Sequence, residues 1–257
     1  MSTTNIHKTA IVSKDAEIHP TATIGPYAVV EGDVEIGART VLGPHAVVRQ
    51  FTRIGENNII DPNAVIGGLP QHAEYDGSET WVIIGHNNVF RESVTVNRAY
   101  HPGSATRIGS GCFFMANSHV GHDCLVEDNT TLTNGVVLGG HVEVGRNAMM
   151  GGYAGAHQFV RVGAYSMVGG YIPLRKDALP FMTIGGEPIR HYRLNSLGLR
   201  RNDIKKERYR ALETAFRAIR DGDTSLEGVP DTEEIIYLRA WLNSESKYGV
   251  YGFAGAS

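Results

Sequence analysis

Residues 24–48 read IGPYAVVEGDVEIGARTVLGPHAVV, and in this stretch every sixth residue is aliphatic. The spacing extends in both directions along the chain. Of the 29 positions from 6 to 174 whose numbers are multiples of six, 22 are Ile, Leu or Val. Neither the period of an α-helix nor that of a β-strand produces this spacing. It is the period of a hexapeptide parallel β-helix.

A hexapeptide repeat predicts a prism with three flat faces. Each hexapeptide supplies one short strand and one corner, so three hexapeptides complete a coil, and the aliphatic residues stack along the axis. Corners require backbone conformations that Gly and Asn tolerate, and Asn57 and Asn87 fall where corners are expected. Prisms of this class are left-handed. We therefore predict a mainly β fold, a left-handed parallel β-helix followed by a C-terminal α-helical domain.

The aliphatic series is interrupted at His72, Ser78 and Pro102. We interpret these interruptions as loops that leave the prism near residues 68–80 and 98–106. Loops on a repeat scaffold often carry the functional site. The aliphatic phase survives both gaps, which leaves open a degenerate coil inside one of them.

The repeat ends after Leu174, which predicts a β-helix domain over residues 1–184 and a helical domain over 185–257. Apolar residues recur at spacings of three and four from Asp203 onward, which predicts a helix that ends near Asp221. Asp231, with Glu234 three residues later, is typical of the N-terminal cap of a second helix.

Composition excludes several classes of protein. The 257 residues include 24 Lys and Arg against 27 Asp and Glu, which is not the basic footprint of a nucleic-acid-binding protein. No apolar run is long enough for a transmembrane helix, and the N-terminus lacks the apolar stretch of a signal peptide. Two cysteines do not make a disulfide framework, so we expect a cytoplasmic protein.

Charge is distributed unevenly in the helical region. Residues 187–220 contain ten Lys and Arg against four Asp and Glu, whereas residues 221–257 contain two against seven. The basic stretch is either a solvated helix face or a dock for an acidic partner. The candidate dock consists of Arg200, Arg201, Lys205, Lys206 and Arg208.

The densest polar cluster in the repeat lies around His119, His122 and Asp123. Val120 occupies the inward position of this hexapeptide, so both histidines lie off the internal ladder and can face outward. A histidine has a suitable pKa for a general base near neutrality, and a neighbouring carboxylate can fix its tautomer. Asp123 is the candidate for that second role.

The predicted coil also places Gly140 near this cluster. Gly140 follows His122 by 18 residues, so it should lie one rung above that histidine. A glycine there presents an unobstructed backbone N–H, which is a suitable oxyanion donor. A histidine base with an N–H donor is what acyl transfer from a thioester to a hydroxyl requires.

These features closely resemble the acyl-ACP–UDP-N-acetylglucosamine O-acyltransferase family of lipid A biosynthesis, over nearly the whole chain. The hexapeptide repeat alone is shared by many acyltransferases. The more specific motifs are Asn117-Ser-His-Val-Gly-His-Asp-Cys124, His157-Gln-Phe159, Met167-Val-Gly-Gly170 and Leu194-Asn-Ser-Leu-Gly-Leu-Arg-Arg201.

The resemblance implies transfer of a (3R)-hydroxyacyl chain from acyl carrier protein to the 3-hydroxyl of UDP-N-acetylglucosamine, by a homotrimer that needs no metal or other cofactor. It implies that His122 is the general base, that Asp123 orients it, and that Gly140 is the oxyanion donor. The substrate-binding positions that it implies are Gln71, His72, His119, His141, His157, Gln158, Asn195 and Arg201, with Gly170 setting the acyl-chain length.

Five positions depart from the common pattern of the family, on the side that should bind the sugar nucleotide. His72 stands where Asp is usual, and Glu74 stands where Lys is usual. The other three are Asn97, Leu197 and Asn202. The acceptor is therefore UDP-N-acetylglucosamine, its 3-amino analogue, or another nucleotide sugar.

Two further hypotheses change the class of the protein. A zinc lyase of the γ-carbonic-anhydrase type would need three ligands, for which His119, His122 and His141 are available. An ice-binding or scaffolding prism would need a regular outward Thr-x-Thr rank, but Thr21-Ala-Thr23 and Thr131-Leu-Thr133 are isolated. The quoted motifs match the acyltransferase better than either.

Overall fold

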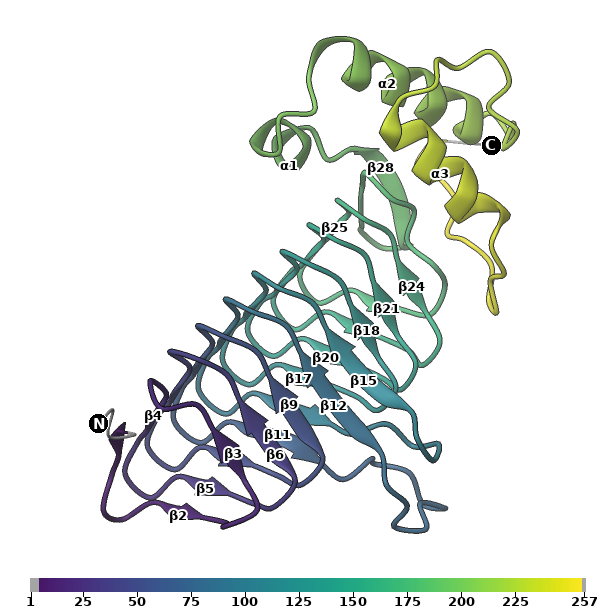
Figure 1. Ribbon diagram of the computed structural model, residues 1–257. Coiled ribbons are helices and arrows are strands. Elements are labelled where there is room, and N and C mark those ends of the chain that lie inside the picture. Colours follow the sequence, from purple (N-terminus) through teal and green to yellow (C-terminus); the bar gives the residue numbers. More distant parts are fainter. Residues whose placement is uncertain (1–4, 256–257) are drawn as a thin grey trace.

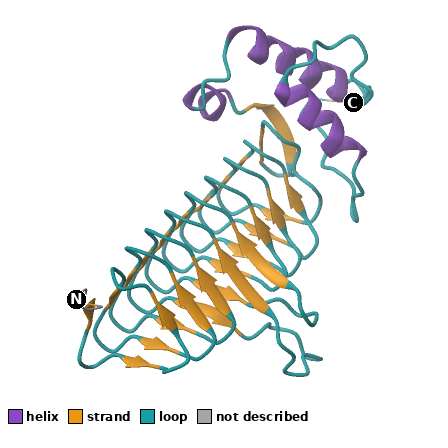
Figure 2. Ribbon diagram, viewed as in Figure 1, coloured by secondary structure: helices purple, strands orange, loops and turns teal. Residues whose placement is uncertain are grey.

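A computed structural model describes residues 5–255, and its strands stack into a triangular prism with helices at one end (Figure 1). Figure 2 shows the short strands along the prism and the helices beyond its C-terminal end. Within residues 5–255 the prism faces are three sheets of eleven, nine and eight strands, which we call sheets A, B and C. The predicted left-handed parallel β-helix with C-terminal helices is confirmed.

The strands follow one another from sheet A to B to C. Sheet A contains β1 (Asn5–Ile6), β4 (Thr23–Ile24), β7 (Val41–Leu42), β10 (Ile59–Ile60), β13 (Val89–Phe90), β16 (Phe113–Phe114), β19 (Thr131–Leu132), β22 (Met149–Met150), β25 (Met167–Val168), β27 (Met182–Gly185) and β28 (Arg190–Leu194). Sheet B contains β2 (Ile11–Val12), β5 (Val29–Val30), β8 (Val47–Val48), β11 (Val65–Gly68), β14 (Thr95–Asn97), β17 (His119–Val120), β20 (Val137–Leu138), β23 (Gly155–Ala156) and β26 (Pro173–Leu174). Sheet C contains β3 (Glu17–Ile18), β6 (Val34–Ile36), β9 (Thr52–Ile54), β12 (Trp81–Ile84), β15 (Ala105–Ile108), β18 (Leu125–Val126), β21 (Glu143–Val144) and β24 (Arg161–Val162).

The strand register explains why the aliphatic phase survives the two gaps. In regular coils a residue pairs with the one 18 places later, as Val120 does with Leu138. Ile60 pairs instead with Phe90, and Phe90 pairs with Phe114. The two enlarged coils therefore contain insertions of 12 and 6 residues, which are whole hexapeptides. The inserted residues lie between β11 and β12 and between β14 and β15, and neither loop forms a coil of its own.

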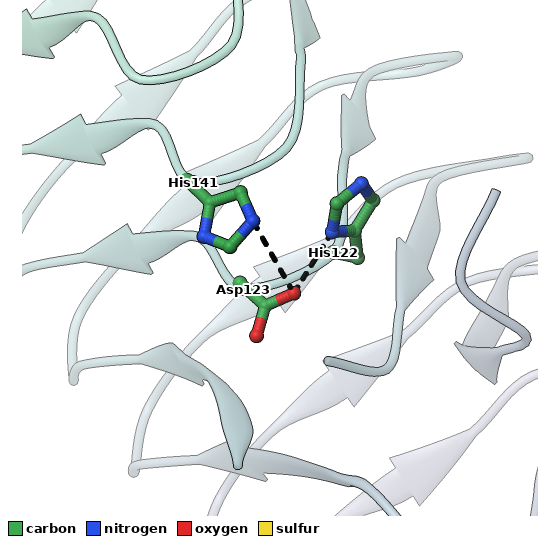
Figure 3. A group of neighbouring side chains, drawn as sticks. All are labelled: His122, Asp123 and His141. Carbon is green, nitrogen blue, oxygen red and sulfur yellow. Dashed lines mark hydrogen bonds and ion pairs between the residues drawn. The ribbon is translucent and has the colours of Figure 1, made fainter. Parts of the chain in front are cut away.

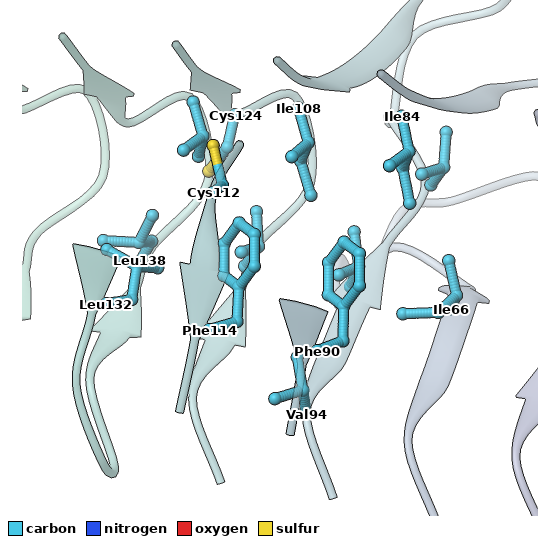
Figure 4. Packing of buried hydrophobic residues seen from close by; sticks show 14 of the residues in the cluster. Ile66, Ile84, Phe90, Val94, Ile108, Cys112, Phe114, Cys124, Leu132 and Leu138 are labelled. Carbon is cyan, nitrogen blue, oxygen red and sulfur yellow. The ribbon is translucent and has the colours of Figure 1, made fainter. Parts of the chain in front are cut away.

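The inward residues form the continuous apolar core that the repeat predicts. Phe90 and Phe114 stack inside the prism with parallel rings whose centroids lie 4.7 Å apart, and Ile66, Leu132 and Leu138 continue the core around them (Figure 4). Corner residues adopt positive φ angles, including 55° at Asn57 and 59° at Asn87, as the composition of the corners predicts.

The C-terminal region differs from its prediction in three respects. Strands β27 and β28 form an antiparallel hairpin that extends sheet A, so the predicted boundary between residues 184 and 185 falls just before the end of β27. The helices are α1 (Ser196–Arg201), which was not predicted, α2 (Lys206–Arg220) and α3 (Glu233–Asn243). Thr232 caps α3 through its side chain, whereas Asp231 forms an ion pair with Arg239.

The chain beyond α3 returns to the prism and is held there by buried hydrogen bonds. The Tyr251 N–H donates to the Asp177 carbonyl at 3.2 Å, and the Asp177 carboxylate pairs with Arg161. His191 accepts from the Leu179 N–H through Nε2 at 2.8 Å and donates through Nδ1 to the Tyr251 carbonyl. This arrangement requires the neutral imidazole, because a proton on Nε2 would face the Leu179 N–H.

We predict that acid weakens this anchor. Burial lowers the pKa of His191 from 6.5 to about 4. Below pH 6.5 the unfolded chain therefore binds a proton at His191 more readily than the folded chain does. The contribution of His191 to the free energy of unfolding is complete above the unfolded pKa and is lost as the pH falls toward 4. Lowering the pH from 7 to 5 should therefore reduce the free energy of unfolding by about 2 kcal/mol through this residue. Denaturant titrations of wild type and His191→Gln at the two pH values measure it, and equal pH dependence in both proteins would contradict it.

Candidate active site

His122 and Asp123 occupy the corner between β17 and β18, where sheet B turns into sheet C. Asp123 adopts a φ of 58°, the left-handed conformation of the corner position. The His122 Nδ1 lies 2.8 Å from the Asp123 Oδ2 (Figure 3). If Nδ1 carries the hydrogen, Nε2 is free to accept a proton. Only 8% of His122 is exposed, so the predicted outward histidine is covered by other parts of the chain.

Gly140 lies one rung above His122, as the 18-residue coil predicts. The His141 N–H donates to the His122 carbonyl at 2.9 Å, which joins the two corners. A Cβ atom built on Gly140 would lie 2.5 Å from both Cε1 and Nε2 of His122. Only glycine therefore leaves room for the ring at this position, and the Gly140 Cα faces the Nε2 edge of the imidazole.

His141 and Asp123 are close enough for a weaker interaction. The His141 Nε2 lies 3.9 Å from the Asp123 Oδ2 (Figure 3), and the His141 ring stacks on Phe159 with centroids 4.6 Å apart. Burial lowers the pKa of His141, although Asp123 acts in the opposite direction. His141 is therefore held as a neutral ring near neutral pH.

The set of three ligands expected for a zinc lyase is not brought together. His119 lies outside the group of ligand atoms formed by His122, Asp123 and His141, and its Nδ1 is 2.7 Å from the Thr95 Oγ1. Burial, followed by the neighbouring His122, lowers the pKa of His119. The geometry instead pairs one histidine with a carboxylate, which is the arrangement of an oriented general base.

Comparison with known proteins gives consistent matches along the chain. Residues 177–247 match the family described as UDP N-acetylglucosamine O-acyltransferase, domain 2, and residues 15–50 and 105–140 match bacterial transferase hexapeptide repeats. The acyl-[acyl-carrier-protein]–UDP-N-acetylglucosamine O-acyltransferase of Anaeromyxobacter dehalogenans 2CP-1 is 46% identical over 243 residues, which cover 90% of this chain and 95% of the relative.

Other relatives and a solved structure are also named as UDP-N-acetylglucosamine O-acyltransferases. The enzyme of the same name from Alkalilimnicola ehrlichii is 51% identical over 84% of both chains, and that from Synechocystis is 44% identical over 62% of this chain and 58% of its own. The crystal structure of the UDP-N-acetylglucosamine O-acyltransferase of Moraxella catarrhalis superimposes with a TM-score of 0.91 at 37% identity, covering 98% of this chain and 100% of that one. This chain belongs to the acyl-[acyl-carrier-protein]–UDP-N-acetylglucosamine O-acyltransferase family. It is a hexapeptide-repeat acyltransferase.

The first loop of this acyltransferase carries two of the predicted substrate-binding residues, and one of them, His72, reaches the site. Gln71 and His72 are exposed in the loop after β11, and the His72 ring lies 3.9 Å from the Tyr100 ring and 5.7 Å from the His122 ring, centroid to centroid. Asn97 is buried and donates to the Leu69 carbonyl at 2.5 Å. Within one chain, Asn97 therefore anchors the loop that carries Gln71 and His72.

Three predicted positions lie farther along the prism. His157 and Gln158 are exposed at the same corner column as His122 and Gly140, two coils above His122. Gly170 is exposed after β25, where an added Cβ would lie 3.2 Å from the Gly152 carbonyl oxygen.

The remaining positions of the family motif lie on α1, in the helical cap. Asn195 accepts from the Gly198 N–H at 3.1 Å and donates to the Tyr165 carbonyl at 2.9 Å, so its side chain caps the helix. Arg201 is exposed, as are the departing residues Leu197 and Asn202. The five departures therefore form two groups in one chain, one around the first loop and one on α1.

Sequence reasoning missed several contacts with the site. A pocket of about 580 Å³ opens beside Asp123 and His141, and Lys247 from the returning tail contributes to its wall. The Lys247 Nζ lies 3.4 Å from the centre of the Phe159 ring. Tyr100 and Ser104, from the second loop, contact Asp123 directly. Tyr100, Ser104 and Lys247 lie outside the hexapeptide pattern, so no periodic signal could have identified them.

Proposed function

We propose that this acyltransferase moves a (3R)-hydroxyacyl chain from acyl carrier protein to the 3-hydroxyl of UDP-N-acetylglucosamine, the first step of lipid A biosynthesis, with His122 as general base. The observation that carries this proposal is the position of the His122 ring, between the Asp123 carboxylate and the Gly140 Cα. The names of the relatives specify the same donor and acceptor, which supports the choice of substrates.

The reaction follows from this geometry. The Nε2 of His122 removes the proton of the sugar 3-hydroxyl, and the oxygen forms a bond to the thioester carbonyl carbon. The Gly140 N–H donates to the resulting oxyanion. The carbon–sulfur bond then breaks, and the imidazolium returns its proton to the departing thiol of the carrier. Asp123 holds Nδ1 throughout and stabilises the imidazolium.

The substrate-binding roles form part of the proposal. His119 and His141 flank the base, and Gln71 and His72 approach it from the first loop. We assign the sugar and the start of the acyl chain to this region. His157 and Gln158 continue the corner toward the helical cap, where the positive charge of exposed Arg201 suits the nucleotide end. Exposed Gly170 suits a role in setting acyl-chain length.

A homotrimer is supported by the outward residues of the prism. Sheets A and B expose aliphatic side chains, among them Val41, Ile59 and Val137. Sheet C presents mainly charges, including the paired Glu35 and Arg53, although Leu125 is also exposed there. Exposed aliphatic side chains that lie along one face are typical of surfaces that partners cover in oligomers, so we assign sheets A and B to contacts between copies. Light scattering should give three times the chain mass, and a monomer would contradict the assignment.

The donor in the proposed reaction, acyl carrier protein, is an acidic protein. A basic surface on the helical cap is a suitable binding site for it. Arg200, Lys205, Lys206 and Arg210 line one groove of about 460 Å³ between α1 and α2. Arg208 belongs to the dock predicted from the sequence, but its guanidinium pairs with Glu233 and Glu234, so we exclude it from the proposed dock. Lys205 also forms an ion pair, with Asp203 at 2.5 Å, so the test uses Lys206 and Arg210. Reversing the charge of these two residues should raise KM for the acylated carrier, and an unchanged KM would contradict the dock.

A cytoplasmic location remains part of the proposal. Both cysteines are buried as free thiols, which suits a reducing compartment. Among the helices within residues 5–255, none combines the length and the apolar character that a bilayer span requires.

The nature of the acceptor can be tested directly. We predict that the purified full-length protein, given 3-hydroxyacyl carrier protein and UDP-N-acetylglucosamine, forms an acyl ester and releases free carrier thiol. Mass spectrometry before and after mild base identifies the linkage, because base cleaves the ester and spares the amide formed with the 3-amino analogue. Efficient transfer to the 3-amino analogue alone would favour the alternative acceptor that the five departures suggest. No transfer to either sugar, with the thioester intact, would refute the proposed function.

A further inference from the structure

The second loop, residues 98–104, contacts the carboxylate that holds the proposed base. The backbone N–H of Tyr100 donates to the Asp123 Oδ2 at 2.8 Å. The Ser104 Oγ lies 3.1 Å from the Asp123 Oδ1. The Oδ2 therefore accepts from this loop and lies against the His122 Nδ1, while the Oδ1 has the Ser104 hydroxyl of the same loop within hydrogen-bond distance.

The contacts fix the direction of the carboxylate as well as its place. The Asp123 N–H donates to the Thr106 Oγ1 at 2.8 Å, which fixes the backbone of the corner. With the backbone held, the side chain still rotates about two bonds, and contacts at both carboxylate oxygens restrain both rotations. A carboxylate that cannot turn keeps the His122 Nδ1 in its hydrogen bond and leaves Nε2 toward Gly140.

The second loop can hold the Asp123 carboxylate in place because contacts with the first loop and with the end of β11 fix its own position. The Gly103 N–H donates to the Glu79 carbonyl at 2.9 Å, and the Arg98 N–H donates to the Gly68 carbonyl at 2.7 Å. The His72 ring packs on the Tyr100 ring. Hydrogen bonds therefore hold the loop near both of its ends, and the His72 ring covers its middle.

Ser104 has two possible acceptors for one hydrogen. Its Oγ lies 2.5 Å from the His101 carbonyl and 3.1 Å from the Asp123 Oδ1. The carboxylate is the stronger acceptor, because hydrogen bonds to an ionised group are roughly twice as strong as neutral ones. Rotation about the Cβ–Oγ bond can direct the hydrogen to either oxygen, and we assign it to the carboxylate.

We propose that Ser104 is a positioning residue for acyl transfer: its hydroxyl, with the Tyr100 N–H, fixes the Asp123 carboxylate, which in turn holds the His122 ring in its reactive orientation. This inference rests on the proposed function of His122 and Asp123. It assigns to the second loop a part in catalysis that is separate from any contact with substrate.

The experiment is a double-mutant cycle with full kinetics on both substrates. Ser104→Ala should lower kcat about tenfold, the effect of one hydrogen bond to a charged group, and leave both KM values within about twofold. Ser104→Thr keeps the hydroxyl and should restore most of kcat. In an Asp123→Asn background, Ser104→Ala should add no further loss, because the group through which it acts is already changed.

The control is Ser225→Ala, which removes a comparable Ser–Asp hydrogen bond, to Asp223 at 2.7 Å, between α2 and α3. It should leave kcat unchanged. Unfolding temperatures establish that each variant is folded. The inference is overturned if Ser104→Ala leaves kcat unchanged, raises KM for the nucleotide sugar instead, or costs the same factor in both backgrounds. Absence of turnover by the wild type would refute the proposed function itself, so the two failures are distinguishable.

Discussion

Replacing His122 with alanine is expected to lower kcat for acyl transfer by about 10² to 10⁴-fold, the usual contribution of a general base. The ring is the proton acceptor that the Asp123 carboxylate orients, and the variant leaves no group in its place. KM for either substrate should change much less, because the base acts mainly in the transition state. Initial rates with saturating acyl carrier protein and nucleotide sugar measure the effect.

His19→Ala provides the control for this variant. His19 is an exposed histidine near the N-terminus whose Nδ1 contacts Thr21, so its loss should leave turnover unchanged. His122→Ala must also retain its circular dichroism spectrum and its unfolding temperature to within a few degrees. A folded His122→Ala protein that turns over at a near-normal rate would rule out His122 as the base.

The second large effect is expected from the smallest possible change, Gly140→Ala. The added methyl carbon would lie 2.5 Å from the Cε1 and Nε2 of His122, closer than side chains approach one another, so the ring must move. The movement takes Nε2 away from the acceptor hydroxyl and crowds the oxyanion position. We expect kcat to fall by about 10² to 10³-fold, comparable with the loss of an oxyanion donor.

Gly32→Ala is the matched control for this substitution. Gly32 also directly precedes a positive-φ residue at a corner from sheet B to sheet C, but an added Cβ would lie 3.5 Å from its nearest neighbour, the Ser13 Oγ. That is an ordinary contact, so activity and stability should stay close to wild type. Similar kinetics for both alanine variants would contradict the steric account of Gly140.

The parts of this molecule that could be predicted from sequence are those that repeat. A strict period of six determines which side chains point inward, and translation by one coil then determines which residues stack. For this reason the proximity of His122 and Gly140 followed from counting alone. The two insertions did not disturb the count because each is a whole number of hexapeptides.

The parts that could not be predicted depend on aperiodic contacts. The approach of Ser104 to Asp123 arises from the path of a loop, and no spacing rule relates these residues. The pairing of Arg208 with Glu234 joins two helices whose packing the sequence does not specify, and it removed Arg208 from the predicted dock. Likewise, Thr232 and Asp231 are both good caps, and only the position of the helix axis selects Thr232.

The most direct test of the central claim is a crystal structure of the protein with its acylated nucleotide-sugar product. The account predicts the ester oxygen on the sugar 3-carbon within about 3 Å of the His122 Nε2, and the ester carbonyl oxygen within about 3 Å of the Gly140 N–H. A product whose ester lies away from both groups, or a His122 ring turned so that Nε2 rather than Nδ1 meets Asp123, would contradict it.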